Sequence, residues 1–278
     1  MGKFSDLVDK FSKDLEIYEK QEAQSLIHWL FEHHLGLRRV DMLGFLDEKH
    51  LPQNFYSDLE RLKIGEPIQY ILGKAPFYGH EFYVSPATLI PRNETEELVH
   101  LILKENKRSG LKVLDIGTGT GCIPISLALE MSGPEVYGLD VSPEALEIAR
   151  KNAKFLRANV TFLQGDILKE MPSVKDLDIL VSNPPYIPEV EKAEMHRNVL
   201  DFEPGLALFV SNEDPLIFYQ AIAEKGLDML KIDGKLYFEI NENYGDAVLN
   251  LLTELGYRNP EIIKDLNGKG RIVKAIRS

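Results

Sequence analysis

Cysteine is almost absent from this 278-residue sequence, which contains a single one, Cys122. One cysteine excludes an internal disulfide and any zinc cluster built on cysteine ligands. Long apolar runs are absent too, and none approaches the roughly 20 residues that a bilayer-spanning helix needs. The first 20 residues are charged and helical in pattern, without the apolar centre of a signal peptide. We therefore expect a cytoplasmic protein.

An excess of positive charge is also missing, because the formal net charge is −12. General affinity for a phosphate backbone is not expected of such a chain, although a local basic patch stays possible. No group of residues has metal-ligand spacing, so we expect no metal. A monomer without membrane or direct nucleic-acid partners is the simplest expectation. With 44% hydrophobic residues, the chain can build one large domain or two smaller ones.

The first 75 residues have the pattern of a small helical bundle. In Glu22–Leu35 the apolar residues recur at spacings of three and four, which makes one helical face, and Gly36 follows as a stop signal. Val40–Leu51 and Phe55–Leu62 are expected to form further short helices, and strand-like alternation is absent. We predict a helical domain over residues 1–75.

The pattern changes between Gly73 and Arg92, where prolines and glycines separate aromatic and β-branched residues. This is typical of a short hairpin, and we predict that residues 76–92 link two domains. Asn93 followed three residues later by Glu96 predicts a capped helix start.

From Lys112 onward, short apolar runs alternate with helical patterns. The predicted strands are Val113–Ile116, Val136–Leu139, Val160–Leu163, Ile179–Val181 and Leu236–Ile240. The predicted helices are Cys122–Met131, Pro143–Leu156, Pro215–Leu230 and Tyr244–Leu255, with Ser142 and Asp214 as caps before prolines. A hairpin of Glu261–Lys264 and Arg271–Ile276 follows. This alternation predicts an α/β fold with a doubly wound, Rossmann-like sheet over residues 93–278.

A glycine-rich turn follows the first of these strands. It reads Gly117-Thr118-Gly119-Thr120-Gly121, directly after Asp115 and Ile116. Glycines let the backbone approach a ligand closely, and the helix that follows offers free N–H groups. A dinucleotide site would need glycine at position 122, and Asp115 would repel a pyrophosphate but suits a ligand with a positive amino group. A plain tight turn without a ligand stays the alternative.

Two further strand ends carry carboxylates. Asp140 ends the second strand about twenty residues after the glycine turn, where nucleotide-binding α/β folds hold a ribose diol. Asp166 and Ile167 follow the third strand, where the acid could bond an adenine amino group and the isoleucine pack on the ring. Taken singly, Asp140 could be a surface acid and Asp166 a loop cap. An amino group, a ribose and an adenine without any phosphate are together the features of S-adenosylmethionine.

Asn183-Pro184-Pro185-Tyr186 follows the fourth strand and contains no nucleophile, histidine base or metal ligand. Two prolines make a stiff loop, and the first holds Asn183 extended. The Asn183 side-chain oxygen and the Pro184 carbonyl can each accept one N–H of a planar NH₂ group, while Tyr186 stacks on it. We predict Asn183, Pro184 and Tyr186 as catalytic, all four residues as the acceptor site, and Asn183 also beside the cofactor. An ordinary proline-rich turn is the alternative.

Several segments together resemble the HemK/PrmC family of protein-(glutamine-N5) methyltransferases, which modify peptide-chain release factors. The matching segments are Gly65–Gly73, Thr88–Val99, Asp115–Ile123, Val181–Pro188, Phe202-Glu203-Pro204 with Ala207-Leu208, and Lys264–Gly268 with Arg271. Asn93 departs from the family, which usually has proline there. The resemblance implies a helical N-terminal domain that docks the protein substrate and a catalytic domain that uses S-adenosylmethionine. It implies that the target is the glutamine of the Gly-Gly-Gln loop of class I release factors.

Three other functions share parts of this pattern. An adenine-N6 nucleic-acid methyltransferase has the same acceptor motif. A domain that binds nucleic acid should be basic, however, and residues 1–75 contain ten basic and thirteen acidic residues. A ribosomal-protein glutamine methyltransferase shares the core and differs in the N-terminal domain. A binding scaffold without catalysis is disfavoured because Asn183 and Tyr186 are intact.

Overall fold

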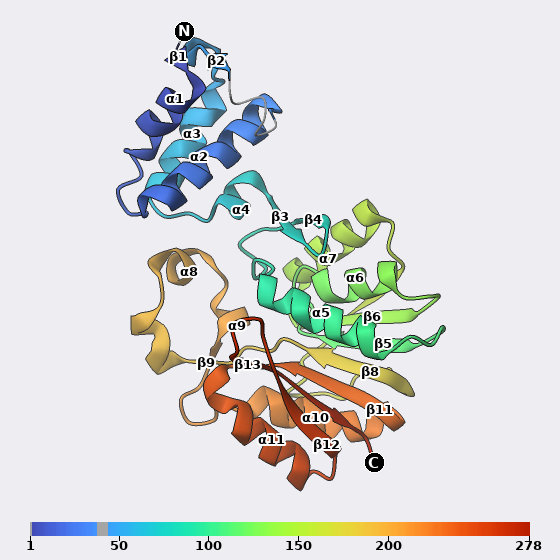
Figure 1. The fold of residues 1–278 in the computed structure, drawn as a ribbon. Coiled ribbons are helices and arrows are strands. Elements are labelled where there is room, and N and C mark those ends of the chain that lie inside the picture. Colours follow the sequence, from blue (N-terminus) through green and yellow to red (C-terminus); the bar gives the residue numbers. More distant parts are fainter. Residues whose placement is uncertain (1, 38–43) are drawn as a thin grey trace. The chain divides into compact units, whose positions relative to one another are not determined.

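The structure is a computed structural model that describes residues 2–37 and 44–278. The chain forms two compact units (Figure 1). One contains the residues up to Lys74 together with His196–Phe202, and the other contains Ala75–Met195 and Glu203–Ser278. The predicted borders at residues 75 and 92 stay a proposal about where the docking part ends and the catalytic part begins.

The first unit is mainly helical. Its elements are β1 (Gly2–Lys3), α1 (Phe4–Ser12), α2 (Lys20–Leu35), β2 (Phe45–Leu46), the 3₁₀ helix η2 (Glu48–His50), α3 (Gln53–Lys63), α4 (Ile68–Leu72) and α8 (Arg197–Phe202). The helix predicted over Glu22–Leu35 is present, and Gly36 ends it with a φ of 63°. Its core contains the fully buried rings of Phe31 and Phe55.

One helix predicted for this unit is wrong in its described part. Residues 40–43 of the predicted helix Val40–Leu51 lie outside the described residues, and the remainder forms β2 and η2. The unit also contains one strand pair that the sequence pattern did not indicate, because β2 pairs antiparallel with β1, Leu46 opposite Gly2. A strand of two residues shows no alternation, and it exists here through a partner distant in sequence.

The second unit is built on a seven-stranded sheet. Its strands are β5 (Lys112–Ile116), β6 (Glu135–Asp140), β7 (Val160–Gln164), β8 (Leu177–Ser182), β11 (Leu230–Glu239), β12 (Arg258–Lys264) and β13 (Gly270–Ile276). Their order is β12-β13-β11-β8-β5-β6-β7. β13 runs antiparallel to both of its neighbours, and the other pairs are parallel. The predicted strands and the C-terminal hairpin are all present.

Helices cover both faces of this sheet (Figure 1). They are α5 (Asn93–Glu105), α6 (Cys122–Glu130), α7 (Pro143–Leu156), α10 (Ile217–Met229) and α11 (Gly245–Glu254). α5 and α6 pack on the face that carries Val113, and α10 and α11 pack on the face that carries Leu114. Neighbouring residues of β5 thus serve opposite cores, as the pleat requires, and the predicted doubly wound fold is confirmed.

Helix starts were predicted with mixed success. Ser142 caps α7 as predicted, since its hydroxyl accepts from the N–H of Ala145 at 3.0 Å. The predicted cap at Asn93 is wrong, because α5 already includes Asn93, and Glu96 instead accepts from the N–H of Tyr78 at 2.7 Å. The cap at Asp214 is wrong as well, because α10 begins only at Ile217. At Asn93 the expected cap fails because the Glu96 carboxylate bonds the backbone of Tyr78, in the hairpin before α5, and not the start of its own helix.

The hairpin before α5 is present as β3 (Lys74–Phe77) and β4 (His80–Tyr83). Its turn residues Tyr78 and Gly79 have φ angles of 48° and 77°, which match the right-handed twist of the strands. The stretch between β8 and α10 contains short elements that the hydrophobic pattern of the sequence did not predict. They are β9 (Ile187–Pro188), η3 (Glu189–Glu194), α8, α9 (Gly205–Leu208) and β10 (Phe209–Val210).

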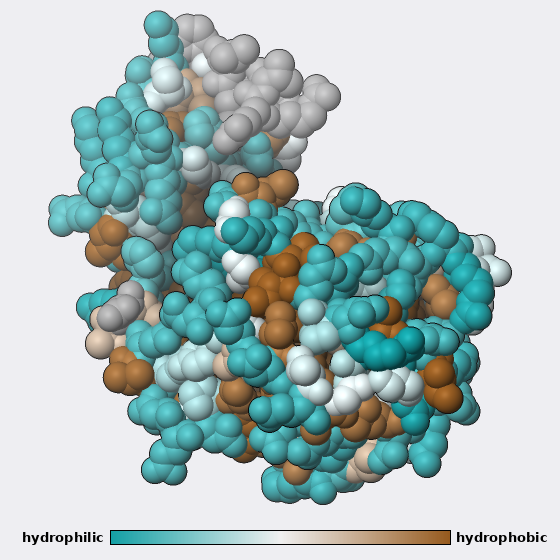
Figure 2. All heavy atoms as spheres, turned by 60° about the horizontal axis from the view of Figure 1, so that its bottom comes forward, coloured by the Kyte–Doolittle hydropathy of each residue, from teal (hydrophilic) through white to brown (hydrophobic). Residues whose placement is uncertain are grey.

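The face shown in Figure 2 is largely hydrophilic, with hydrophobic residues gathered in limited patches. Within the described ranges, no helix is long and apolar enough to cross a membrane.

Candidate active site

A cavity of about 400 Å³ lies within the second unit, at the carboxyl ends of the parallel strands. β5 and β8 are neighbours there although the chain visits β6 and β7 between them, so strand order reverses at this point. Open α/β sheets bind their ligands at such reversals. The lining residues come from the glycine turn and the start of α6, the three loops after β6, β7 and β8, the segments 87–95 and 204–207, and Phe218 and Ile222 on α10.

The glycine turn is fastened to the neighbouring strand. The N–H groups of Gly117 and Thr118 donate to the carbonyl of Leu139 at 2.9 and 3.0 Å. Gly117 has a φ of 74°, a left-handed conformation that favours glycine, and a Cβ there would lie in ordinary contact, 3.9 Å from the carbonyl oxygen of Asn183. The turn thus brings backbone atoms close to the loop after β8.

Asp115 lies behind this turn with no exposed surface and is not one of the cavity-lining residues. Neither of its carboxylate oxygens has a hydrogen-bond partner, and the same holds for the Thr118 hydroxyl. Burial raises the pKa of Asp115 to about 7; the nearby Thr118 hydroxyl lowers it by a smaller amount, and the Asp140 charge adds to the increase. An unpaired buried carboxylate is costly, and a cationic group would compensate it.

Asp140 lines the cavity at the end of β6. Its two oxygens accept from the N–H of Gly119 at 2.7 Å and of Ser142 at 3.0 Å. Burial raises the pKa of Asp140, and these backbone donors partly offset the increase. Each oxygen keeps a free lone pair, so the carboxylate can still accept from a diol.

Asp166 and Ile167 both line the cavity after β7. Asp166 also forms an ion pair with Lys169 at 2.7 Å and accepts from the N–H of Leu168 at 3.0 Å, and the Lys169 hydrogen bond is the largest cause that lowers its pKa. Ile167 is buried and packs into the core under the loop. An apolar wall with an anchored polar rim suits a planar ring.

Asn183, Pro184 and Pro185 line the cavity directly after β8. Ser182 anchors this loop, because its hydroxyl donates to the carbonyl of Ile116 at 2.7 Å and so ties the ends of β8 and β5 together. Tyr186 is not among the lining residues: its ring packs on the core and its hydroxyl donates to Glu239 at 3.4 Å. Its predicted stacking on an acceptor stays a prediction.

Four residues around the cavity were missed by sequence reasoning. Thr95, on α5, accepts from the side-chain amide of Asn183 at 3.3 Å and donates to the buried Glu239 at 2.7 Å. Arg92 pairs with the buried Glu203 at 2.6 Å. Thr95, Arg92 and Glu203 stand in segments that carry the family resemblance. Glu239 gave a signal of its own, since an acid inside the apolar run Leu236–Ile240 is unusual.

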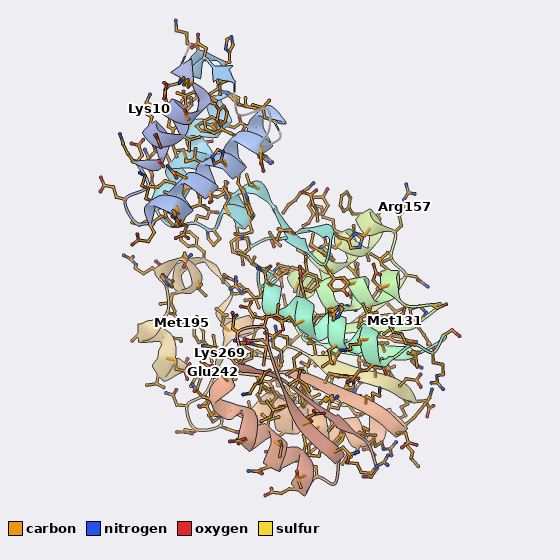
Figure 3. All side chains as sticks on the ribbon, in the orientation of Figure 1. Lys10, Met131, Arg157, Met195, Glu242 and Lys269 are labelled. Atoms are coloured by element: carbon orange, nitrogen blue, oxygen red, sulfur yellow. The ribbon has the colours of Figure 1, made fainter. Side chains whose placement is uncertain are left out.

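The C-terminal hairpin reaches the same edge of the sheet. Arg271 on β13 donates to Asp265 at 3.3 Å and contributes to the electrostatic environment of Glu239. Nearby, Lys269 and Glu242 point toward each other and pair at 2.9 Å (Figure 3). Among residues 2–37 and 44–278 no group of three or more His, Cys, Asp or Glu is arranged to hold a metal ion.

The residues that line the cavity, together with Asp115 behind its wall, fit S-adenosylmethionine. The orphaned carboxylate of Asp115 suits a positive amino group, Asp140 has lone pairs for a ribose, and Ile167 offers an apolar wall. The structure brings the predicted residues of the glycine turn and the three strand ends together around one cavity, with Asp115, Gly121 and Tyr186 behind its walls.

Comparison with known proteins agrees with this geometry. Residues 6–73 match the PrmC N-terminal domain, and residues 107–238 match a methyltransferase domain. The release factor glutamine methyltransferase of Flavobacterium psychrophilum is 44% identical over 266 residues, 93% of each chain. That of Bacteroides thetaiotaomicron is 46% identical over 270 residues, 94% of this chain and 95% of its own.

The fold is similar to that of solved methyltransferases. A methyltransferase from Pyrococcus furiosus superposes with a TM-score of 0.55 at 21% identity, over 73% of this chain and 91% of its own. This similarity supports the fold alone. The relatives that match over nearly the whole chain show the family, and the chain therefore belongs to the release factor glutamine methyltransferases.

Proposed function

We propose that this protein transfers a methyl group from S-adenosylmethionine to the side-chain amide nitrogen of the glutamine in the Gly-Gly-Gln motif of class I release factors. The main support is that the glycine turn and the Asn183-Pro184-Pro185 loop line one cavity, with the two loops nearly in contact at Gly117. Family membership supports the same substrate.

The cofactor half of the proposal assigns roles to the strand-end acids. When bound, S-adenosylmethionine supplies an electrophilic methyl group. Asp115 compensates its amino group, Asp140 accepts from its ribose hydroxyls, and Asp166 with Ile167 holds the adenine. Gly117, Thr118, Gly119, Thr120 and Gly121 let the ligand lie against the backbone, and Asn183 borders it.

The acceptor half assigns the chemistry to positioning. An amide nitrogen is a poor nucleophile because its lone pair is delocalised. The Asn183 side-chain oxygen and the Pro184 carbonyl accept the two N–H groups of the glutamine, which orients the nitrogen toward the methyl group. Proline rigidity at Pro184 and Pro185 keeps these acceptors in place. Such alignment can contribute roughly 7–11 kcal/mol to catalysis.

The helical unit has a separate proposed role. Residues 6–73 match the PrmC N-terminal domain, which supports docking of the release factor by this unit. We also propose that the protein is a monomer and acts in the cytoplasm, where translation terminates.

A methyl-transfer assay tests this function. The purified chain is incubated with S-adenosylmethionine and a recombinant class I release factor, and mass spectrometry should find one added methyl on the Gly-Gly-Gln glutamine. Asn183→Ala should lose transfer and keep most of its cofactor affinity, while Asn243→Ala, at an exposed asparagine, should match the unmodified protein. A factor in which this glutamine is alanine should receive nothing. Transfer to DNA or a ribosomal protein but not to the factor would overturn the proposal.

A further inference from the structure

Glu239 is a buried acid that takes no part in the proposed binding of the cofactor or the acceptor. It stands at the end of β11 and only 1% of its surface is exposed. Its carboxylate accepts from the Thr95 hydroxyl at 2.7 Å and from the Tyr186 hydroxyl at 3.4 Å. The acid therefore lies one hydrogen bond away from Thr95 on α5 and from the loop that contains Asn183.

The Thr95 hydroxyl connects Glu239 to Asn183. A hydroxyl has one hydrogen to donate, and an ionised carboxylate can only accept. The Thr95 hydrogen is therefore directed at Glu239, and the Thr95 oxygen can only accept from Asn183. The Asn183 side-chain nitrogen donates to it at 3.3 Å. The two edges of the Asn183 amide are thereby distinguished, with the nitrogen toward Thr95 and the oxygen on the other edge.

We propose that Glu239 and Thr95 are positioning residues, which act through this chain of hydrogen bonds to hold the Asn183 amide with its oxygen toward the acceptor nitrogen. This inference rests on the proposed function, because it presumes an acceptor with N–H groups to donate. The opposite orientation would present the Asn183 NH₂ to the substrate NH₂, and two donors cannot bond each other.

The charge of Glu239 sets the direction of the hydrogen bonds that run from Glu239 through Thr95 to Asn183. A protonated Glu239 can donate to Thr95, which frees the Thr95 hydrogen to donate to the oxygen of Asn183 and reverses the amide. The groups with the largest effect on Glu239 are Glu94 and Thr95 from α5, Tyr186 from the loop after β8, and Arg271 from β13. Cys122 on α6 and Tyr219 on α10 are the other titratable groups that interact with its charge. Arg271 and the two hydroxyls favour the ionised form, and Glu94 opposes it.

Burial outweighs these partners and raises the pKa of Glu239 to about 7. An acid with this pKa is protonated below pH 7, so the productive amide orientation is lost as pH falls through about 7. The turnover number at saturating cofactor and release factor should therefore decline on the acid side. Saturation matters because Asp115 titrates in the same range in the ligand-free protein.

The test compares variants in the full chain with the release factor as substrate. Glu239→Gln keeps the shape of the side chain but offers Thr95 either an oxygen or a nitrogen. The direction of the hydrogen bonds through Thr95 is then no longer fixed. Thr95→Val removes the connection, and Thr95→Ser keeps it. Tyr257→Phe is the control, because it deletes a buried hydrogen bond of 2.8 Å to the Ala223 carbonyl elsewhere in the same core.

We expect the turnover number to fall about 10-fold in Glu239→Gln and about 100-fold in Thr95→Val, as loss of oriented hydrogen bonds predicts. Thr95→Ser and Tyr257→Phe should stay within about 3-fold of the unmodified protein. Glu239→Gln should also lose the acid limb of the pH profile between pH 6 and 8. Cofactor affinity by calorimetry should be unchanged in all four variants, which separates positioning from binding.

Two results would overturn the inference. One is a turnover number in Glu239→Gln that equals that of the unmodified protein and keeps its acid limb. The other is a loss of activity in Thr95→Ser as large as in Thr95→Val. If Thr95→Val fails to fold, the turnover number and pH profile of Glu239→Gln still decide the matter. Absence of methyl transfer by the unmodified protein would instead refute the proposed function itself.

Discussion

Asp115 carries its carboxylate in a place where no neighbouring side chain compensates the charge. Its pKa of about 7 in the fold lies above the ordinary value of 3.8. An acid whose pKa is raised by folding destabilises the folded state where the unfolded chain is ionised. This destabilisation grows as pH rises from about 4 to about 7 and is complete above that range. A bound cation would remove it.

We therefore expect Asp115→Asn to be more stable than the unmodified protein at pH 8 and to bind the cofactor less well. The gain in melting temperature of the ligand-free protein should be larger at pH 8 than at pH 5.5. Loss of a charge-assisted contact should weaken cofactor binding about 10- to 100-fold. Thermal melts and calorimetry measure the two effects. Equal affinity of variant and unmodified protein at pH 8 would show that Asp115 does not hold the amino group.

The sequence predicted which residues lie at the cavity where a motif at a strand end marks them, and missed those whose position depends on burial. The glycine turn, Asp140 and Asn183 lie there as predicted, and their chemical roles stay predictions. Thr95 and Glu239 were missed because their pairing joins residues 144 positions apart in the chain. Nothing in the sequence near either residue indicates that pairing.

At the scale of elements, Glu203 connects two segments that line the cavity. It accepts from the N–H of Ile90 at 3.2 Å and from Arg92 at 2.6 Å, and its side chain is almost fully buried. The segment before α5 and the start of α9 are thus held by one carboxylate. Its loss should loosen both segments together.

Glu203→Gln should destabilise the protein by about 1–3 kcal/mol, because a buried charged acceptor is replaced by a weaker neutral one. Glu242→Gln is the matched control, since its pair with Lys269 is exposed and worth at most about 1 kcal/mol. Denaturant unfolding gives both values, and hydrogen exchange should show faster exchange in Pro204–Leu208 of the first variant only. Equal destabilisation by the two substitutions would contradict a role for Glu203 as a connector.

The strands of the large sheet could be predicted because parallel strands buried on both faces are nearly continuous apolar runs. The short elements between Ile187 and Val210 could not, since a helix of four to six residues has too few turns to show a face. The caps at Asn93 and Asp214 failed for a related reason. Whether a side chain caps a helix depends on competing partners that tertiary structure supplies.

At the scale of the whole molecule, every residue that lines the cavity belongs to the second unit. A ligand that binds only the folded state raises stability by about 2.7 kcal/mol at a concentration 100 times its dissociation constant. S-adenosylmethionine should therefore stabilise this unit directly.

Calorimetry of the full chain should accordingly resolve two unfolding transitions. The larger one should move to higher temperature as S-adenosylmethionine is added, and the smaller one, from the helical unit, should stay in place. The variant Asp140→Ala should show a smaller shift of the larger transition. A single transition that moves as a whole would show that the two units unfold together, and would count against independent docking and catalytic parts.

The position of β13 has a consequence for how the enzyme is made. β12 precedes β13 in the chain, yet β13 lies between β12 and β11 in the sheet. When β12 has just been synthesised, it therefore has no neighbouring strand to pair with until β13 has also emerged from the ribosome. Glu239 pairs across the sheet with Ile272, and Arg271 comes with the same strand. Nascent chains should thus keep an incomplete catalytic edge until β13 has emerged, and activity should not arise before then.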